Sequence, residues 1–165
     1  MTNSVSSLFP NGVKPGLIVP YAHKGEWAVH EVLPFVFSEI GAFHLSVATF
    51  NVSEDSLRPI FFMRERGELL SVRFLFDANI QRHKVDMLYF SANIADSVRS
   101  SYSHMKIMLC VSERLSLAVV GSANMNRVHR HEAGIVTTDK TMCDFYQSYF
   151  DNVFENDSIP FVLND

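Results

Sequence analysis

Hydrophobic and polar positions in the first half of the chain predict an alternation of helices and strands. Apolar residues recur near helical spacing over residues 23–43, with Gly41 as a stop, and this pattern predicts a helix. Residues 43–52 form a β-branched and aromatic run that predicts a buried strand. A serine cap and an acidic first turn predict a helix over residues 53–68, and residues 69–77 predict a second strand. This βαβ-like order favours a parallel pair of strands.

The second half of the chain predicts a group of strands closed by one amphipathic helix. Residues 78–102 are polar and give only a weak indication of a short strand around Met87–Phe90. Three strands separated by short polar segments are then predicted, at residues 104–111, 115–122 and 132–138. Residues 139–154 predict the closing helix, whose apolar face carries Phe145, Tyr149 and Val153.

Composition predicts one globular domain in a reducing compartment. The chain has 165 residues, of which 47% are hydrophobic and 19% charged, and these values fit a single soluble domain over residues 23–165. Residues 1–22 are rich in Ser, Pro and Gly and predict an extended N-terminal arm. No run approaches the ~18 apolar residues of a membrane span, and no signal-peptide pattern opens the chain. Cys110 and Cys143 lie in apolar surroundings, so we expect reduced thiols and a cytoplasmic protein.

Charge is distributed unevenly along the chain. The net charge of −4 argues against broad nonspecific binding of nucleic acid. Between His104 and His131, however, the chain has four basic residues and only one acidic residue. This local surplus of positive charge indicates an anion-binding site in that stretch.

Two polar residues at the start of a buried strand point to the chemistry of that site. His104 and Lys106 are two residues apart, so in a strand their side chains lie on the same face. If residues 104–111 and 115–122 form a hairpin, the segment Gly121–Asn124 returns towards this pair, and Glu132 opens the next strand. The sequence therefore predicts a polar cluster at one edge of the sheet, where open α/β sheets carry ligands.

Each of these residue types suits the chemistry of a phosphodiester. A neutral imidazole such as that of His104 can attack phosphorus and form a covalent intermediate. Lys106 and Asn124 can bind non-bridging oxygens and offset the negative charge of the transition state. Glu132 can hold the imidazole in one tautomer. This chemistry requires no metal or cofactor, and a metal cluster at residues 129–132 is disfavoured because neighbouring strand residues face opposite sides.

The "GSAN" segment has two interpretations. Ser122 can donate a hydrogen bond to a bound phosphate, and Gly121 lets the backbone approach the anion closely. The alternative is that the four residues only form a turn, which is the more frequent role of such a segment when it stands alone.

Taken together, "HMK", "GSAN" and "HEAGIV" resemble the His-x-Lys…Gly-Ser-x-Asn signature of the phospholipase D superfamily, over roughly residues 25–155. The resemblance implies a mixed β-sheet sandwiched by helices and a phosphodiesterase that forms a phosphohistidine at His104. One position departs from the family pattern, which has Asp five residues after the Lys, where this chain has Val111. The hairpin through "VSERLS" is also about three residues longer than usual.

The single signature implies how the site is completed. The family's active site takes two signatures, and small bacterial endonucleases with one copy form homodimers. The resemblance therefore implies a homodimer in which one His104 is the nucleophile and the other protonates the leaving group. The favoured substrate is nucleic acid. The alternatives are a noncatalytic phosphate- or nucleic-acid-binding module, and a phospholipid phosphodiesterase.

Overall fold

The computed structural model describes residues 4–162 and contains one eight-stranded mixed β-sheet with the strand order β1-β7-β6-β5-β2-β3-β4-β8. The strands are β1 (Ile18–His23), β2 (Phe43–Thr49), β3 (Leu69–Asp77), β4 (Ser97–Ser101), β5 (Ile107–Val111), β6 (Ser116–Gly121), β7 (Glu132–Thr137) and β8 (Ile159–Pro160). The helices are η1 (Val5–Leu8), η2 (Val29–Glu31), α1 (Val32–Ile40), α2 (Glu54–Glu65), α3 (Ala78–His83), α4 (Val85–Ile94) and α5 (Lys140–Asn156). Among these described helices, none is long and apolar enough to cross a membrane.

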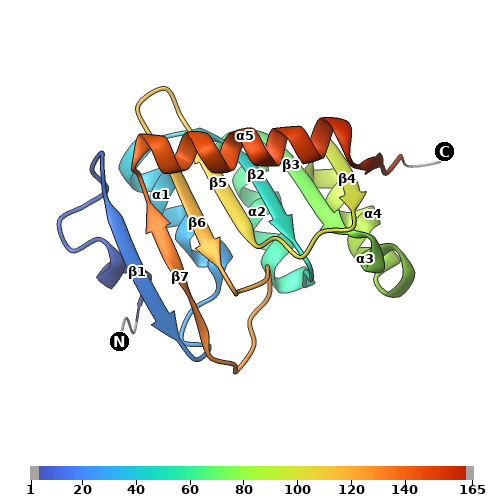
Figure 1. Ribbon diagram of the computed structural model, residues 1–165, viewed down its shortest axis with the longest axis horizontal. Helices are drawn as coiled ribbons and strands as arrows, with labels where there is room; N and C mark the ends of the chain where they lie inside the picture. Colours follow the sequence, from blue (N-terminus) through green and yellow to red (C-terminus); the bar gives the residue numbers. More distant parts are fainter. Residues whose placement is uncertain (1–3, 163–165) are drawn as a thin grey trace.

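The predicted parallel pair and the predicted hairpin are both confirmed. β2 and β3 pair in parallel and are joined by α2, and β4 pairs in parallel with β3. β5 runs antiparallel to β2, and β6 returns beside β5 in the register Val111↔Ser116. The carboxyl ends of the three parallel strands therefore meet the start of β5 and the end of β6 at one edge of the sheet, the lower edge in Figure 1.

Helices cover both faces of the sheet, as predicted for this fold class. α1, α2 and α4 lie behind the sheet in Figure 1, and α5 crosses its front. Behind the sheet lies the larger apolar core, which includes Phe43, Phe74 and Phe76. On the front face, Phe150 and Phe154 of α5 pack against small and aliphatic strand residues such as Ala48. The mixed α/β sandwich expected from the sequence is confirmed.

The N-terminal segment packs against the domain and does not extend from it as an arm. Ile18–His23 add an edge strand, β1, antiparallel to β7. Leu8 and Phe9 are buried in the larger core. Burial of these apolar side chains supplies the free energy that orders a segment rich in Ser, Pro and Gly. Residues 1–3 of the predicted arm lie outside the described residues.

The expectation of a short strand around Met87–Phe90 is wrong, because these residues lie within helix α4. The buried residues of α4 are Leu88, Ser91 and Ile94, whose spacing of three is a helical period. A serine at one of these buried positions hides the pattern from a reading of apolar residues alone.

The predicted apolar face of the last helix is only partly correct. Val153 is buried, whereas the side chains of Phe145 and Tyr149 are 64% and 51% exposed. The buried stripe of α5 consists of Cys143, Phe150, Val153 and Phe154. The helix has apolar residues on two stripes, and contact with the sheet selects one of them: the guanidinium of Arg73 lies 5.1 Å from the ring centre of Phe150.

Candidate active site

His104 and Lys106 form the centre of the polar cluster at the lower edge of the sheet. They do not open a strand as predicted, because β5 begins only at Ile107. The Lys106 ammonium lies 3.1 Å from Nδ1 of His104 and donates a hydrogen bond of 2.9 Å to the His104 carbonyl. His104 is exposed, and its ring centre lies 4.7 Å from that of Phe50, the residue after β2. The imidazole therefore has an aromatic ring and a cation as neighbours and remains accessible to solvent.

Lys106 is half-buried, and this changes its acid–base behaviour. Burial lowers the pKa of Lys106, while the carboxylates of Glu132 and Asp77 act in the opposite direction. The ammonium also lies 5.6 Å from the centre of the Phe50 ring, over its face. Lys106 is thus a cation in a partly desolvated position, where its charge interacts more strongly with a bound anion than it does in bulk water.

Asn124 is held at the end of β2 by its side-chain oxygen. This Oδ1 atom accepts a hydrogen bond of 3.1 Å from the Asn51 backbone N–H. It also lies 3.4 Å from the Thr49 hydroxyl, which donates to the Asn51 carbonyl at 2.7 Å. The Thr49 hydroxyl in turn accepts a bond of 3.0 Å from the backbone N–H of Met125. The Oδ1 atom of Asn124 is thus already hydrogen-bonded, whereas its Nδ2 group has no hydrogen-bond partner among residues 4–162. The Nδ2 group can therefore donate to a bound anion.

Ser122 and Glu132 contact each other across the ends of β6 and β7. The Ser122 hydroxyl donates to a Glu132 carboxylate oxygen and accepts a bond of 3.1 Å from the Ala133 backbone N–H. No hydrogen bond joins Glu132 to His104 within the described part of this chain, so the predicted orientation of the imidazole by Glu132 has no direct contact in the protomer. Glu132 instead acts on the cluster through its charge, which opposes the lowering of the Lys106 pKa.

Gly121 makes room for a neighbouring strand. A Cβ atom at this position would lie 2.6 Å from the Ala133 carbonyl and 3.0 Å from Cα of Gly134, and would collide with the Tyr21 hydroxyl. Tyr21, on β1, is buried, and burial with the nearby Glu132 carboxylate raises its pKa to about 12. Close packing of β1, β6 and β7 therefore explains this glycine without any bound anion.

Two positioning groups were missed by sequence reasoning. The buried carboxylate of Asp77 accepts hydrogen bonds from the backbone N–H groups of Asn79 at 2.9 Å and Ser103 at 3.2 Å. It therefore fixes the segment that leads into His104. Phe50 supports the imidazole from the end of β2. Asp77 is the last residue of β3, and Phe50 directly follows β2. Ligands bind at the carboxyl ends of parallel strands, so these positions in the sequence could have identified both residues.

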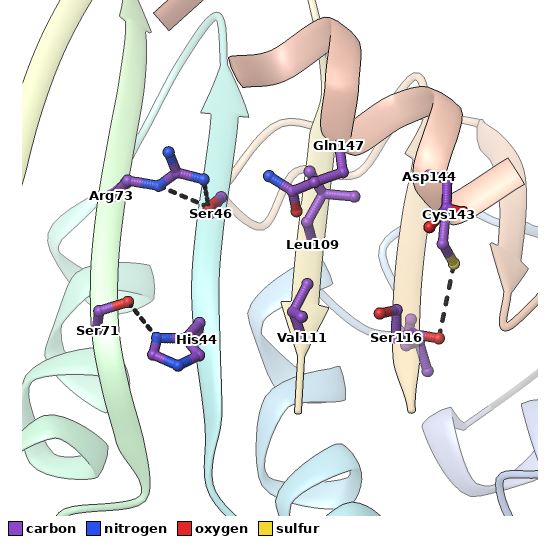
Figure 2. A pocket seen from close by; sticks show the side chains of 11 residues that line it. His44, Ser46, Ser71, Arg73, Leu109, Val111, Ser116, Cys143, Asp144 and Gln147 are labelled. Atoms are coloured by element: carbon purple, nitrogen blue, oxygen red, sulfur yellow. Dashed lines mark hydrogen bonds between the residues drawn. The ribbon is translucent and has the colours of Figure 1, made fainter. Parts of the chain in front are cut away.

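Val111, the departure from the family pattern, lies at the far end of β5. Five residues of strand separate it from Lys106, which corresponds to about 17 Å. Figure 2 shows Val111 beside His44, its register partner on β2, in a pocket of about 370 Å³ under α5. Its side chain does not reach the cluster around His104.

The "HRHE" segment remains on the surface. His129, Arg130 and His131 are exposed, in the turn that leads to β7. Among residues 4–162, no group of three or more His, Cys, Asp or Glu side chains is arranged to hold a metal ion.

Comparisons with known proteins support the fold through structure alone. No protein-family model and no curated protein matches the sequence. Nuc from Salmonella typhimurium, a phospholipase D family member, superposes with a TM-score of 0.68 at 13% identity, over 90% of this chain and 99% of Nuc.

Two larger proteins contain a similar domain. TrmBL2, an archaeal chromatin protein with a novel mode of DNA binding, superposes with a TM-score of 0.58 at 11% identity, over 90% of this chain and 55% of TrmBL2. Phosphatidylserine synthase from Haemophilus influenzae gives 0.55 at 12% identity, over 87% of this chain and 40% of the synthase. The resemblance to the phospholipase D superfamily is therefore confirmed at the level of the fold: this chain has the phospholipase D fold.

Proposed function

We propose that the protein is a phosphodiesterase that acts without a metal and through a phosphohistidine, with nucleic acid as substrate. The observation that carries the proposal is the pair of His104 and Lys106. An accessible imidazole lies 3.1 Å from an ammonium at the edge of an α/β sheet where ligands bind. This pair supplies a nucleophile and a partner for the phosphate charge.

The reaction proceeds in two displacements at phosphorus. An imidazole nitrogen of His104 attacks, a P–N bond forms, and the P–O bond to the leaving group breaks. His104 of a second copy of the chain donates a proton to the leaving oxygen. Water then attacks phosphorus, the P–N bond breaks, and the second imidazole takes up the proton from the water.

The other residues of the cluster stabilise the charge that develops. Lys106 and the Nδ2 group of Asn124 bind the non-bridging oxygens. Ser122, with its hydroxyl directed to Glu132, is a further contact at the rim of the site. The charge of Glu132 favours the protonated form of Lys106 and opposes the effect of burial on its pKa. Phe50 and Asp77 are positioning residues, because they contact His104 and the segment before it.

A homodimer completes this site. The chain carries one His-x-Lys signature and the reaction uses two imidazoles, so the second must come from another copy. The similarity to Nuc, a phospholipase D family member, over 99% of its length supports phosphodiester chemistry in a domain of this size. We infer that the two His104 side chains face one shared cleft.

A noncatalytic nucleic-acid-binding module is the second candidate. TrmBL2, whose fold is similar over 90% of this chain, is described by its mode of DNA binding. The contact of Glu132 with Ser122 in place of His104 also favours binding over turnover. A phospholipid phosphodiesterase is the third candidate, and the similarity to phosphatidylserine synthase supports it.

Hydrolysis assays with purified protein separate these candidates. We expect cleavage of a chromogenic phosphodiester and of DNA or RNA in the presence of EDTA, abolished by His104→Ala and reduced ~10²–10³-fold by Lys106→Met. His44→Ala is the matched control. His44 is also exposed, but it lies near the start of β2, whereas the candidate site lies at the other end of this strand, next to Phe50. Full activity in folded His104→Ala would refute the catalytic role of this residue.

Substrate and assembly need separate measurements. Binding of DNA without turnover of any diester would favour the noncatalytic module, and cleavage of phospholipid alone would favour the third candidate. The dimer is tested by sedimentation and by adding increasing amounts of His104→Ala subunits to the wild type. If both imidazoles are needed, the activity of the wild-type subunits falls as mixed dimers form. A monomer at every concentration contradicts the shared cleft.

A further inference from the structure

An exposed aromatic side chain lies beside the candidate nucleophile. Tyr102 follows β4, is 90% exposed and precedes His104 by two residues, a separation of at most about 7 Å along the chain. It lines a groove of about 490 Å³ at the carboxyl ends of β3 and β4, the same edge of the sheet that carries His104. The groove volume lies within the range of small-ligand sites in proteins.

The backbone on both sides of Tyr102 is fixed. Ser101 pairs with Asp77 at the end of the parallel ladder between β3 and β4. The backbone N–H of Ser103 donates to the Asp77 carboxylate at 3.2 Å, and that of Met105 donates to the Ser103 hydroxyl at 3.2 Å. An exposed ring on an ordered backbone is a preorganised platform, because binding a ligand costs little conformational entropy.

The surroundings of the ring are polar. Gln81, Arg82, Asn156 and Asp157 line the same groove and are all exposed. Arg82 makes no ion pair with any residue of the described part of the chain, residues 4–162. One aromatic face, one available guanidinium and several hydrogen-bonding groups match a nucleotide: the ring stacks on the base and Arg82 binds a phosphate.

We propose that this groove binds a nucleotide next to the scissile phosphate and that the substrate is therefore single-stranded nucleic acid. The inference rests on the proposed function and names its substrate class. Tyr102 can stack only on a base whose face is free, and a base within a duplex is covered on both faces.

Binding to oligonucleotides in a His104→Ala background tests the groove without cleavage. Fluorescence anisotropy is measured with labelled single-stranded DNA and RNA and with a duplex of the same sequence. We expect Tyr102→Ala to weaken single-strand binding about 5- to 150-fold, the effect of one lost base–aromatic stack, and Tyr102→Phe to retain it. Tyr149→Ala is the matched control, because Tyr149 on α5 is also an exposed tyrosine, at 51%, and does not line this groove. Arg82→Gln should weaken binding and lower its dependence on salt.

Each outcome has a defined meaning. If Tyr102→Ala binds single-stranded oligonucleotides as tightly as the His104→Ala parent, the groove is not a nucleotide site, and the proposed phosphodiesterase activity is unaffected. Binding of the duplex as tightly as the single strand also overturns the inference. Absence of binding to any nucleic acid contradicts the proposed function itself. Loss of the dimer in Tyr102→Ala, seen by sedimentation, assigns the ring to the subunit contact and overturns the nucleotide site.

Discussion

Restoring the family carboxylate at position 111 tests whether this departure affects the candidate active site. Val111 ends β5 and is half-buried, with the exposed His44 directly opposite on β2. Val111→Asp places a carboxylate on the same face as this imidazole, at the cross-strand distance of about 5 Å. The perturbation is therefore a new charge at the end of β5 remote from Lys106.

The expected effect on turnover is small, because distance and solvent screen the charge. Five strand residues separate positions 106 and 111, which gives about 17 Å. In water, two unit charges at this separation interact by about 0.2 kcal/mol. Ionic screening at physiological salt, with a Debye length of about 8 Å, reduces this to below about 0.1 kcal/mol. We therefore expect turnover to change by less than about 1.5-fold.

The expected effect on stability is also modest. Replacing a half-buried valine removes roughly 1 kcal/mol of apolar burial. A cross-strand polar contact between the new carboxylate and His44 returns about 0.2–1 kcal/mol. The free energy of unfolding should therefore fall by no more than about 1 kcal/mol.

The assay compares Val111→Asp with Val111→Asn, which has a similar shape but no charge. Hydrolysis of a chromogenic diester gives turnover, and urea unfolding followed by circular dichroism gives stability. An increase in turnover of tenfold or more in Val111→Asp, with Val111→Asn unchanged, would mean that the family carboxylate acts on the site. That result would refute the reasoning from distance.

Three further predictions concern pH and packing. Burial lowers the pKa of Lys106, so the alkaline fall of the pH–rate profile should lie below the range of an ordinary lysine, and Lys106→Arg should remove it. Gly121→Ala places a Cβ atom 2.6 Å from the Ala133 carbonyl. This substitution should lower the free energy of unfolding by about 1–3 kcal/mol, measured by thermal unfolding. Burial lowers the pKa of His30, so below about pH 6.5 the unfolded chain takes up a proton that the folded protein does not. Stability should therefore fall as the pH falls through this range, by up to about 1.4 kcal/mol per pH unit, and His30→Gln should flatten the dependence.

Each of these predictions has a result that contradicts it. An alkaline limb that persists unchanged in an active Lys106→Arg variant assigns the titration to another group. Wild-type stability of Gly121→Ala removes the packing explanation, whereas partial rescue by Tyr21→Phe supports it, because the Tyr21 hydroxyl is one of the colliding atoms. Equal slopes of stability against pH for wild type and His30→Gln show that His30 does not cause the acid loss.

The sequence by itself determined the elements that carry strong local patterns. The runs 43–52 and 69–77 are dense in β-branched and aromatic residues, and both form central strands, β2 and β3. His104 and Lys106 lie just before β5, which begins at Ile107, so the strand alternation used to predict a shared face does not apply to them; their spacing of two nevertheless leaves their polar groups 3.1 Å apart. These features depend on contacts between residues close in sequence, so spacing and residue type were sufficient to predict them.

Only the tertiary structure decided the contacts between distant segments. Residues 18–23 become strand β1 because β7 offers an unpaired edge and the core buries Leu8 and Phe9. The Glu132 carboxylate accepts a hydrogen bond from the Ser122 hydroxyl, whereas the sequence predicted that it would orient the His104 imidazole. Both outcomes depend on which edges and surfaces meet after folding.

The last helix shows the same division most clearly. Its aromatic residues made a helix predictable over 139–154, but they lie on two stripes, and both could serve as the buried face. The sheet buries Phe150 and Phe154 and leaves Phe145 and Tyr149 exposed. An apolar residue shows a preference for burial, whereas the partner that buries it comes from segments far away in the chain, here the front face of the sheet with Ala48, Leu75 and Ala118.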